Sequence, residues 1–388
     1  MRRTIIHRSS TDTIATRATI ATRATIATRA TIATRATIAT RATIATRTTI
    51  VALAAGALAL TGCASSSGDT ANASSPGGDL AKVSFALDWA PNTGHVGLYV
   101  ADELGYFEEA GLDVEILPYG STPATQLVSA GEADFGIGGQ SQVQMGRTSG
   151  LDLVSVYRTT QTDTGRIVTL AGRDDITRPA DLDGLVFGGF GAPLYTALAK
   201  GTIEGDGGTG DFEEVALDTG AYEALSQGRI DFTLSVSTWE NVQAKLDGHP
   251  YQEFRYQDFG VPDQQGGGIV SSEAYLDAHP DEAKAFVHAI ARGYAYADEH
   301  PDEAAELLLK ANPDTLGKSK ELVRASMQLI ADEGYFRADG LEIGAANPAF
   351  WDEFGTFLLD GGFLVDANGE KLTEQPDWSE YYTDEYLG

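Results

Sequence analysis

The sequence predicts an α/β fold built from two successive sets of alternating strands and helices. From Ala81 onward, short apolar runs of strand length alternate with amphipathic segments of helix length. Glycine stands at nearly every joint between them, as short strand-to-helix connections require. A polar stretch at Asp174–Asp183 separates the two sets. This alternation is typical of largely parallel sheets covered by crossover helices.

The first set opens with the strand Val83–Leu87, a polar turn, a helix from His95 to Gly105, and the strand Leu112–Leu117. The elements expected after it are the helices Pro123–Ala130 and Gln140–Arg147 and the strands Ala133–Ile137, Leu153–Thr159 and Arg166–Ala171.

The second set begins after residue 183. Its expected strands are Leu185–Gly188, Glu213–Leu217 and Ile230–Val236, and its expected helices are Ala192–Lys200, Tyr222–Gln227 and Thr238–Leu246. Three glycines, residues 266–268, then lead into Ile269–Ser272, which we interpret as a strand that returns to the first sheet. The resulting prediction is one lobe of residues 81–172 plus 268–388 and a second lobe of residues 173–267, with crossings near Gly172 and Gly268.

The last third of the chain reads as mostly helical. His-Pro-Asp-Glu occurs at residues 279–282 and again at 300–303, which suggests either a metal site or two helix starts. Proline at the first helical position and acids in the first turn favour helix starts. Residues 366–369 (DANG) indicate a tight hairpin turn, because the glycine and the closing glutamate of a calcium loop are missing from their places.

The amino-terminal segment, residues 1–62, predicts export and not a folded domain. The hexapeptide ATIATR occurs five times in succession from Ala18 to Arg47, and its period of six gives no apolar helix face. An apolar run of eleven residues, 50–60, fits a signal-peptide core and is too short to span a membrane. Leu-Thr-Gly-Cys then resembles the bacterial lipobox, so we expect lipidation at Cys63; an accidental cysteine behind an ordinary signal is the alternative. Residues 63–80 read as a flexible tether.

Composition excludes several classes of function. The net charge is −29, and residues 63–388 hold 55 acidic and 18 basic side chains, a balance that repels nucleic acid. A single cysteine permits no intrachain disulfide and no cysteine metal cluster. The sequence contains no phosphate-binding loop, nucleophile elbow or zinc-protease motif, and no Gly-x-Gly-x-x-Gly dinucleotide fingerprint follows the first strand. We therefore expect no catalytic residues, no metal and no cofactor.

Three groups of residues are the candidate ligand site. The first is Asp88, Trp89, Asn92 and His95, which follow the carboxyl end of the opening strand, where ligands bind in open α/β sheets. The alternative for this group is a core tryptophan and an ordinary turn aspartate.

The second group is the glycine-rich turn 188–195, with Phe190, Gly191 and Tyr195, and the third is Trp239 with Glu240. An ordinary strand-to-helix turn, and a core tryptophan beside a surface glutamate, are the alternatives. Gln140, the first residue of a predicted helix, completes the set of candidates.

Residues 88–116 (DWAPNTGHVGLYVADELGYFEEAGLDVEI) resemble the opening of the THI5/NMT1-like family, also called SsuA/THI5-like. Weaker matches are Gly131–Gly136, the glycine turn 188–191, residues 230–240 and the carboxyl-terminal segment 381–387. The resemblance runs from Lys82 nearly to the end of the chain. It implies a type II periplasmic-binding-protein fold, in which two α/β lobes joined by a two-segment hinge enclose a ligand.

The resemblance also implies a function. Bacterial members are substrate-binding lipoproteins of ABC importers, so we expect a monomer at the outer face of the cell membrane. Its partners would be a permease, an ATPase and a small aromatic solute, and the lipid would be its only contact with the membrane. A thiamine pyrimidine precursor, either hydroxymethylpyrimidine or formylaminopyrimidine, is the expected ligand, because aromatic rings could stack on it and carboxylates could accept its amine hydrogens. Riboflavin is the rival ligand, and sulfonate-type solutes are weaker rivals.

One branch of the family is an enzyme, a pyrimidine synthase that uses a cysteine-rich run, a lysine and a histidine. This chain has Asp263–Gly267 in place of the run, and Gly138 and Gln142 where that branch has the lysine and histidine. The differences argue against the enzyme. A solute sensor with the same fold is a third possibility.

Overall fold

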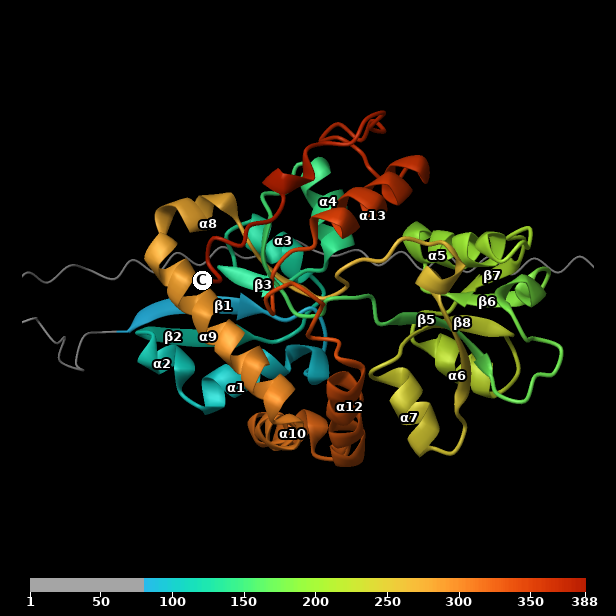
Figure 1. Cartoon of the computed structure of the whole chain (residues 1–388), viewed down its shortest axis with the longest axis horizontal. Coiled ribbons are helices and arrows are strands. Elements are labelled where there is room, and N and C mark those ends of the chain that lie inside the picture. Colours follow the sequence, from blue (N-terminus) through green and yellow to red (C-terminus); the bar gives the residue numbers. More distant parts are fainter. Residues whose placement is uncertain (1–79) are drawn as a thin grey trace, which may run out of the picture. The chain divides into compact units, whose positions relative to one another are not determined.

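The computed structural model describes residues 80–388 (Figure 1). The predicted leader and signal peptide, the lipidation site Cys63 and nearly all of the tether lie outside the described residues.

The first sheet has five strands in the order β2-β1-β3-β10-β4. Its strands are β1 (Ala81–Ala86), β2 (Leu112–Leu117), β3 (Phe135–Ile137), β4 (Val154–Arg158) and β10 (Gly268–Ser271). β1 pairs in parallel with β2 and β3, and β10 is antiparallel to its two neighbours. The predicted return of the chain to the first sheet after residue 267 is confirmed.

The second sheet also has five strands, in the order β7-β6-β8-β5-β9. Its strands are β5 (Gly165–Leu170), β6 (Val186–Gly189), β7 (Glu213–Ala216), β8 (Phe232–Val236) and β9 (Tyr251–Arg255). β6 pairs in parallel with β7 and β8, whereas β5 is antiparallel to β8 and β9. The edge strand β9 was not expected from the sequence.

The first crossing between the sheets comes earlier than the prediction near Gly172. β5 pairs in the second sheet, so the chain leaves the first sheet at residues 159–164 and returns at residues 256–267. Residues 174–183 lie within the second lobe, between β5 and β6. The prediction was wrong because the apolar pattern of a strand shows that it is buried but not which sheet buries it.

Helices cover both sheets (Figure 1). In the first lobe and the carboxyl-terminal region they are α1 (Val96–Glu103), α2 (Tyr106–Glu109), α3 (Ala124–Ser129), α4 (Gln140–Thr148), α8 (Glu273–Ala278), α9 (Pro280–Glu299), α10 (Pro301–Ala311), α11 (Pro313–Leu316), α12 (Lys320–Glu333) and α13 (Pro348–Asp360), with the 3-10 turns η1 (Thr93–His95) and η4 (Trp378–Glu380). In the second lobe they are α5 (Pro193–Gly205), α6 (Gly220–Ser226) and α7 (Glu240–Leu246), with the 3-10 turns η2 (Pro179–Leu182) and η3 (Tyr256–Phe259). The two His-Pro-Asp-Glu segments start α9 and α10 with proline in the first turn, which confirms the helix-start prediction.

The predicted helix from His95 to Gly105 corresponds to α1, whose ends lie within two residues of the prediction, and α2 is a separate helix after Gly105. His95 ends η1, and Gly105 adopts a φ of +74° between α1 and α2. The predicted tight turn at residues 366–369 is confirmed, because Val365 and Lys371 form an antiparallel bridge around it. No helix within residues 80–388 combines the length and apolarity that crossing a membrane requires.

Close contact between α1 and α9 fixes the turn that follows β1. A β-carbon on Gly97 would lie 2.2 Å from the Tyr294 ring, and one on Gly293 would lie 2.0 Å from the Gly97 carbonyl oxygen. Glycine at both positions lets the helices approach, and the Tyr294 hydroxyl then donates to the Gly94 carbonyl at 2.6 Å. Packing of α9 thereby holds the polar turn in place.

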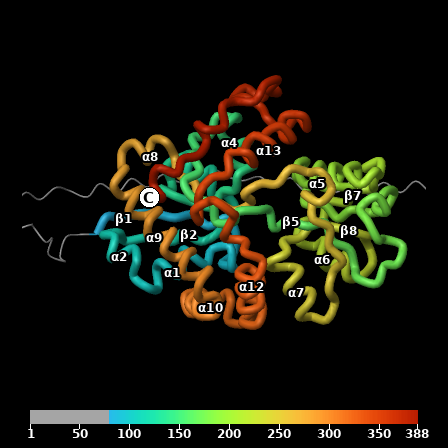
Figure 2. Tube along the Cα trace, viewed as in Figure 1, coloured from blue at the N-terminus to red at the C-terminus, as the bar shows by residue number. Residues whose placement is uncertain are grey.

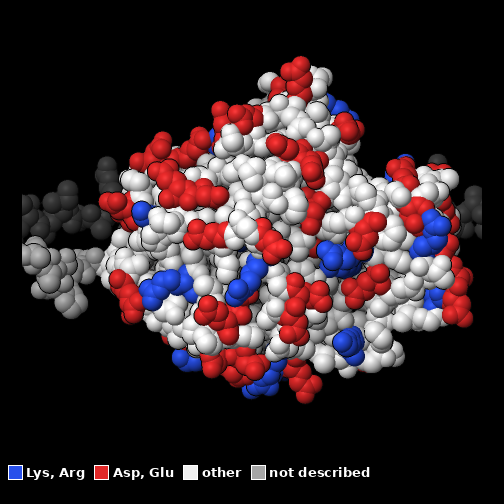
Figure 3. Space-filling view, in the orientation of Figure 1, with Lys and Arg blue, Asp and Glu red and all other residues white. Residues whose placement is uncertain are grey.

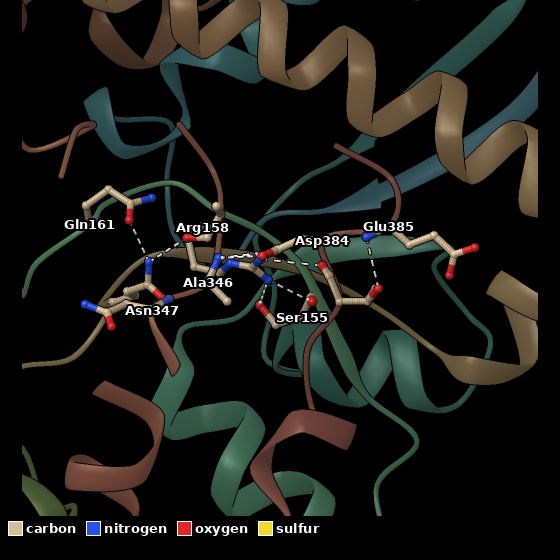
Figure 4. A network of polar contacts seen from close by, with 10 residues as sticks. Ser155, Arg158, Gln161, Ala346, Asn347, Asp384 and Glu385 are labelled. Atoms are coloured by element: carbon tan, nitrogen blue, oxygen red, sulfur yellow. Dashed lines mark hydrogen bonds and ion pairs between the residues drawn. The ribbon is translucent and has the colours of Figure 1, made fainter. Parts of the chain in front are cut away.

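The carboxyl-terminal segment returns to the first lobe (Figure 2). Ser155 of β4 forms a parallel bridge with Tyr382, and the buried Arg158 pairs with Asp384 (Figure 4). Burial lowers the pKa of Arg158 to about 9, so the guanidinium remains charged at neutral pH. These contacts cover the edge strand of the first sheet.

The Gln265 side chain ties the second crossing to two other segments, the first crossing and residues 345–347. It is fully buried, and its amide nitrogen donates to the Gln161 side-chain oxygen at 2.7 Å and to the Ala345 carbonyl at 2.8 Å. Its amide oxygen accepts from the Asn347 backbone at 2.8 Å. Figure 4 labels Gln161, Ala346 and Asn347 beside this junction. Because Gln161 belongs to the first crossing, both crossings are joined at one buried amide.

We expect Gln265→Leu to lower the free energy of unfolding by about 2 kcal/mol, because three buried polar groups lose their partner at once. Denaturant unfolding measures the change. Gln243→Leu is the control, since Gln243 makes only a surface contact with Asp247 and its loss should cost less than about 0.5 kcal/mol. Equal losses in the two variants would contradict the role given to Gln265.

Candidate functional site

The first half of the candidate site is the polar turn after β1. Asp88 and His95 are brought together, with the His95 Nε2 atom 2.9 Å from the Asp88 carboxylate. His95 is buried, whereas the Asp88 side chain is 39% exposed. The paired imidazole orients the carboxylate and leaves its exposed side free to accept hydrogen bonds.

The Asn92 side chain is hydrogen-bonded within its own turn. Its side-chain oxygen accepts from the Gly94 backbone at 2.8 Å, and its nitrogen donates to the Ala90 carbonyl at 3.0 Å. Asn92 therefore shapes the turn that carries Asp88 and His95.

Trp89 is exposed, as a ligand-stacking side chain must be. It is 46% accessible and lies against Tyr119, with ring centroids 5.1 Å apart. Tyr119, 48% accessible, was missed by the sequence analysis. It follows β2, the parallel neighbour of β1, and the carboxyl ends of parallel strands meet at one sheet edge. Applying that rule to Pro118-Tyr119-Gly120 would have found it.

The second half is an aromatic cluster on the second lobe. Gly191, with a φ of +75°, ends the turn after β6, and Phe190 lies 5.9 Å from Tyr195 and 6.0 Å from Tyr222 between ring centroids. Tyr195 is 43% accessible. Phe190 and Tyr195 are thus brought together as predicted, and Tyr222 joins them from α6.

Carboxyl groups surround this cluster. Burial raises the pKa of Tyr195, and the carboxylates of Asp163 and Asp88 raise it further. Asp88 belongs to the first lobe and Tyr195 to the second. The carboxyl of Asp163, in the first crossing, accepts from the Gly165 backbone and from the Gln264 amide, both at 2.7 Å. Burial raises the pKa of Asp163 too.

Glu240 is the first residue of α7. Its carboxylate accepts from the Val236 backbone at 3.0 Å, and burial raises its pKa. The main cause of the raised pKa of Tyr222 is burial, and the Glu240 carboxylate raises it further. The half-buried Trp239 side chain instead packs against the hydrophobic core that contains β1 and α9. It therefore forms a contact between the two lobes.

The side chain of Gln140 makes its hydrogen bonds within the protein. It is buried; its nitrogen donates to the Phe350 carbonyl at 2.8 Å and its oxygen accepts from the Gln265 backbone at 3.1 Å. The backbone of Gln140 also donates to the Gln265 carbonyl at 3.2 Å, and the Gly139 backbone donates to the Gln142 side chain at 2.9 Å. The backbone amides of Gly139 and Gln140 at the start of α4 are therefore already used, which disfavours an anion there.

We group these residues as a candidate aromatic-carboxylate site, which we define as Asp88, Trp89 and Tyr119 on the first lobe and Phe190, Tyr195, Tyr222 and Glu240 on the second. Its exposed rings offer flat apolar contact, and its carboxylates offer hydrogen-bond acceptors. Such a site suits a flat, uncharged or cationic ligand that carries N–H donors.

Proteins of similar sequence have names that refer to the binding or the synthesis of pyrimidines. The chain is 35% identical over 222 residues to the formylaminopyrimidine-binding protein of Halalkalibacterium halodurans, a match that covers 55% of this chain and 66% of that protein, just under two thirds of its length. It is 22% identical over 223 residues to the 4-amino-5-hydroxymethyl-2-methylpyrimidine phosphate synthase of Uromyces fabae, covering 55% of this chain and 65% of that protein.

Among solved structures, the alkanesulfonate-binding protein SsuA from Xanthomonas axonopodis pv. citri superimposes with a TM-score of 0.57 at 13% identity, covering 75% of this chain and 96% of that one. At so low an identity the similarity shows the fold alone. The superposition confirms the predicted type II periplasmic-binding fold. The family model described as NMT1/THI5 like matches residues 92–304, more than half of the sequence. The chain therefore belongs to the NMT1/THI5-like family.

Proposed function

We propose that this chain is the extracytoplasmic substrate-binding subunit of an ABC importer and that it binds a thiamine pyrimidine precursor, formylaminopyrimidine or hydroxymethylpyrimidine. The observation that carries the proposal is the aromatic-carboxylate site, contributed by both lobes. Trp89 and Tyr195 expose ring faces, and Asp88 and Glu240 supply acceptors for an exocyclic amine. The name of the Halalkalibacterium relative points to the same ligand class.

The proposal includes anchoring by a lipid on Cys63 and delivery to a permease and its ATPase. The folded part would then act as a monomer outside the membrane. Acidic side chains spread over the face shown in Figure 3 are in keeping with a soluble exported domain.

Local packing supports a binding protein over a synthase. A β-carbon on Gly138 would lie 2.9 Å from the side chains of Thr125 and Val270, so a lysine there would not fit without rearrangement. Gln142, at the position of the synthase histidine, caps the amino terminus of α4. Asp263, in the segment aligned with the cysteine-rich run, instead accepts from Thr162 and from the Asp163 backbone and so joins the two crossings.

Calorimetry with the purified protein tests the proposal. We expect binding of formylaminopyrimidine or hydroxymethylpyrimidine and no heat with an alkanesulfonate, because the carboxylates repel an anion. Riboflavin is the informative competitor, since the adjacent rings of Trp89 and Tyr119 could also support a larger ring system. Tight riboflavin binding without pyrimidine binding would overturn the ligand assignment but keep the importer function.

Glu240→Gln tests the acceptor role through its pH dependence. The pKa of Glu240 is raised in the folded protein, so ionisation costs stability as the pH rises above the ordinary glutamate value of about 4.3. The variant should therefore melt at a higher temperature than the wild type at pH 7 and at the same temperature below about pH 4.

The same variant should bind the pyrimidine at least about tenfold more weakly at pH 7, because a charged acceptor is lost. Melting curves at both pH values and calorimetry provide the measurements, and Glu223→Gln, on the exposed side of α6, is the control. A melting difference that is the same at both pH values would show that Glu240 does not act through its charge.

A further inference from the structure

Helix α12 belongs to the carboxyl-terminal part of the chain but contacts the turns that follow β1 and β8, which adjoin residues of the aromatic-carboxylate site. Ser326, in the middle of α12, is fully buried. Its hydroxyl donates to the Thr238 carbonyl and lies 2.6 Å from the Thr93 hydroxyl, which therefore donates to Ser326. Thr93 directly follows Asn92 in the first-lobe turn, and Thr238 directly precedes Trp239 and Glu240. One hydroxyl thus joins the turn after β1 to the turn after β8.

Tyr335, which follows α12, makes a second junction. Its hydroxyl accepts from the Arg166 guanidinium at 2.8 Å and lies 3.2 Å from the Ser237 hydroxyl. Arg166 lies on β5 and Ser237 follows β8, both in the second lobe. The Tyr335 carbonyl also accepts from the Gln161 backbone in the first crossing at 2.8 Å.

Neither Ser326 nor Tyr335 belongs to the aromatic-carboxylate site. The hydroxyl groups of both, and those of Thr93 and Ser237, are on residues no more than 5% exposed. Buried polar groups are stable only when they are paired, so these contacts favour the one lobe arrangement that pairs them. If the lobes move apart, water must replace the contact of Ser326 with Thr238 and those of Tyr335 with Arg166 and Ser237.

We propose that Ser326 and Tyr335 are positioning residues that couple the two halves of the ligand site by stabilising the arrangement in which both face one another. The inference rests on the proposed function, because it concerns affinity at that site. A ligand that needs both halves binds with an affinity proportional to the fraction of molecules in the competent arrangement. Removing the Ser326 hydroxyl lowers that fraction and weakens binding without touching the ligand.

The distance between the lobes is the test that does not depend on the ligand. Spin labels at Lys284→Cys in α9 and Arg229→Cys in the second lobe, both exposed, are placed in the full chain carrying Cys63→Ser, and pulsed electron paramagnetic resonance gives the distance distribution. Ser326→Ala should shift the ligand-free distribution toward longer distances. Ser271→Ala is the matched control, since its buried hydroxyl donates at 2.7 Å to the Asp134 carbonyl within the first lobe alone.

Binding is measured on the same proteins with formylaminopyrimidine and hydroxymethylpyrimidine. Ser326→Ala should weaken affinity about tenfold, mostly through faster dissociation, whereas Ser271→Ala should bind like the wild type. Tyr335→Phe should show the same shift in distance, and it replaces Ser326→Ala if that variant does not fold.

The outcomes separate the two proposals. Distance distributions of Ser326→Ala and Tyr335→Phe that match the wild type would overturn the positioning role, whatever the ligand. A wild-type protein that binds neither pyrimidine would overturn the proposed ligand and leave the distance result standing.

Discussion

Replacing Trp89 with alanine is expected to abolish most ligand binding and to leave the fold intact. The ring is half exposed and contacts mainly Tyr119, so its removal opens no cavity in the core. Loss of a central aromatic contact in a binding site typically costs about 2–4 kcal/mol, which corresponds to a weakening of thirty- to a thousandfold. Calorimetry with the pyrimidine measures the affinity, and thermal unfolding without ligand measures the stability.

Two further variants sharpen this test. Trp89→Phe keeps a ring and should recover a large part of the affinity. Leu246→Ala removes an equally exposed apolar side chain at the end of α7 and should change neither affinity nor melting temperature. Wild-type affinity in Trp89→Ala would show that the exposed ring does not contact the ligand.

Replacing Arg158 with methionine is expected to give the largest loss of stability, about 3 kcal/mol. The guanidinium is 1% exposed, and it donates to the Ser155 carbonyl at 2.9 Å and to the Asp384 carboxylate. Methionine fills much of the volume but leaves Asp384 with only the Ala346 backbone donor. Removal of one partner from a fully buried ion pair costs about 3–5 kcal/mol, and the 42% exposed Asp384 side chain places the expectation at the low end.

The substitution should cause local unfolding of the carboxyl-terminal segment before the whole protein unfolds. Hydrogen exchange should rise first at residues 381–387, because Arg158 and the Ser155–Tyr382 bridge hold that segment on β4. Arg292→Met is the control: its ion pair with Glu109 is exposed on both sides and contributes no more than about 1 kcal/mol. Unchanged exchange at residues 381–387 would show that the segment is held by other contacts.

Local sequence patterns were sufficient for most of the secondary structure. The bounds of β2 agree with the prediction, and those of β8 and α4 differ by two residues or fewer at each end. These elements are specified by apolar periodicity and by glycine at their ends, and both are properties of neighbouring residues. The strand β9 was missed because Tyr251–Arg255 (YQEFR) has two aromatic residues three positions apart, so it shows neither a period of two nor an apolar run.

The candidate site was predicted in part. Phe190, Tyr195, Asp88 and Trp89 lie where a ligand could reach them, since they follow strand ends, and that rule can be applied to sequence alone. Asn92 and Gln140 have suitable chemistry, but their amides are occupied by backbone groups of Gly94 and Gln265. Whether a polar side chain is free depends on neighbours that the sequence does not identify.

The sequence by itself determined the fold class, the export signal we expect and the residues at the ends of the strands, because each depends on a local pattern of apolar, glycine and polar residues. Only the tertiary structure decided where the chain first crosses between the sheets, that Tyr119 accompanies Trp89, and that Ser326 joins Thr93 to Thr238. Such contacts join residues as many as 233 positions apart, and they form only when packing of both lobes brings their surfaces together.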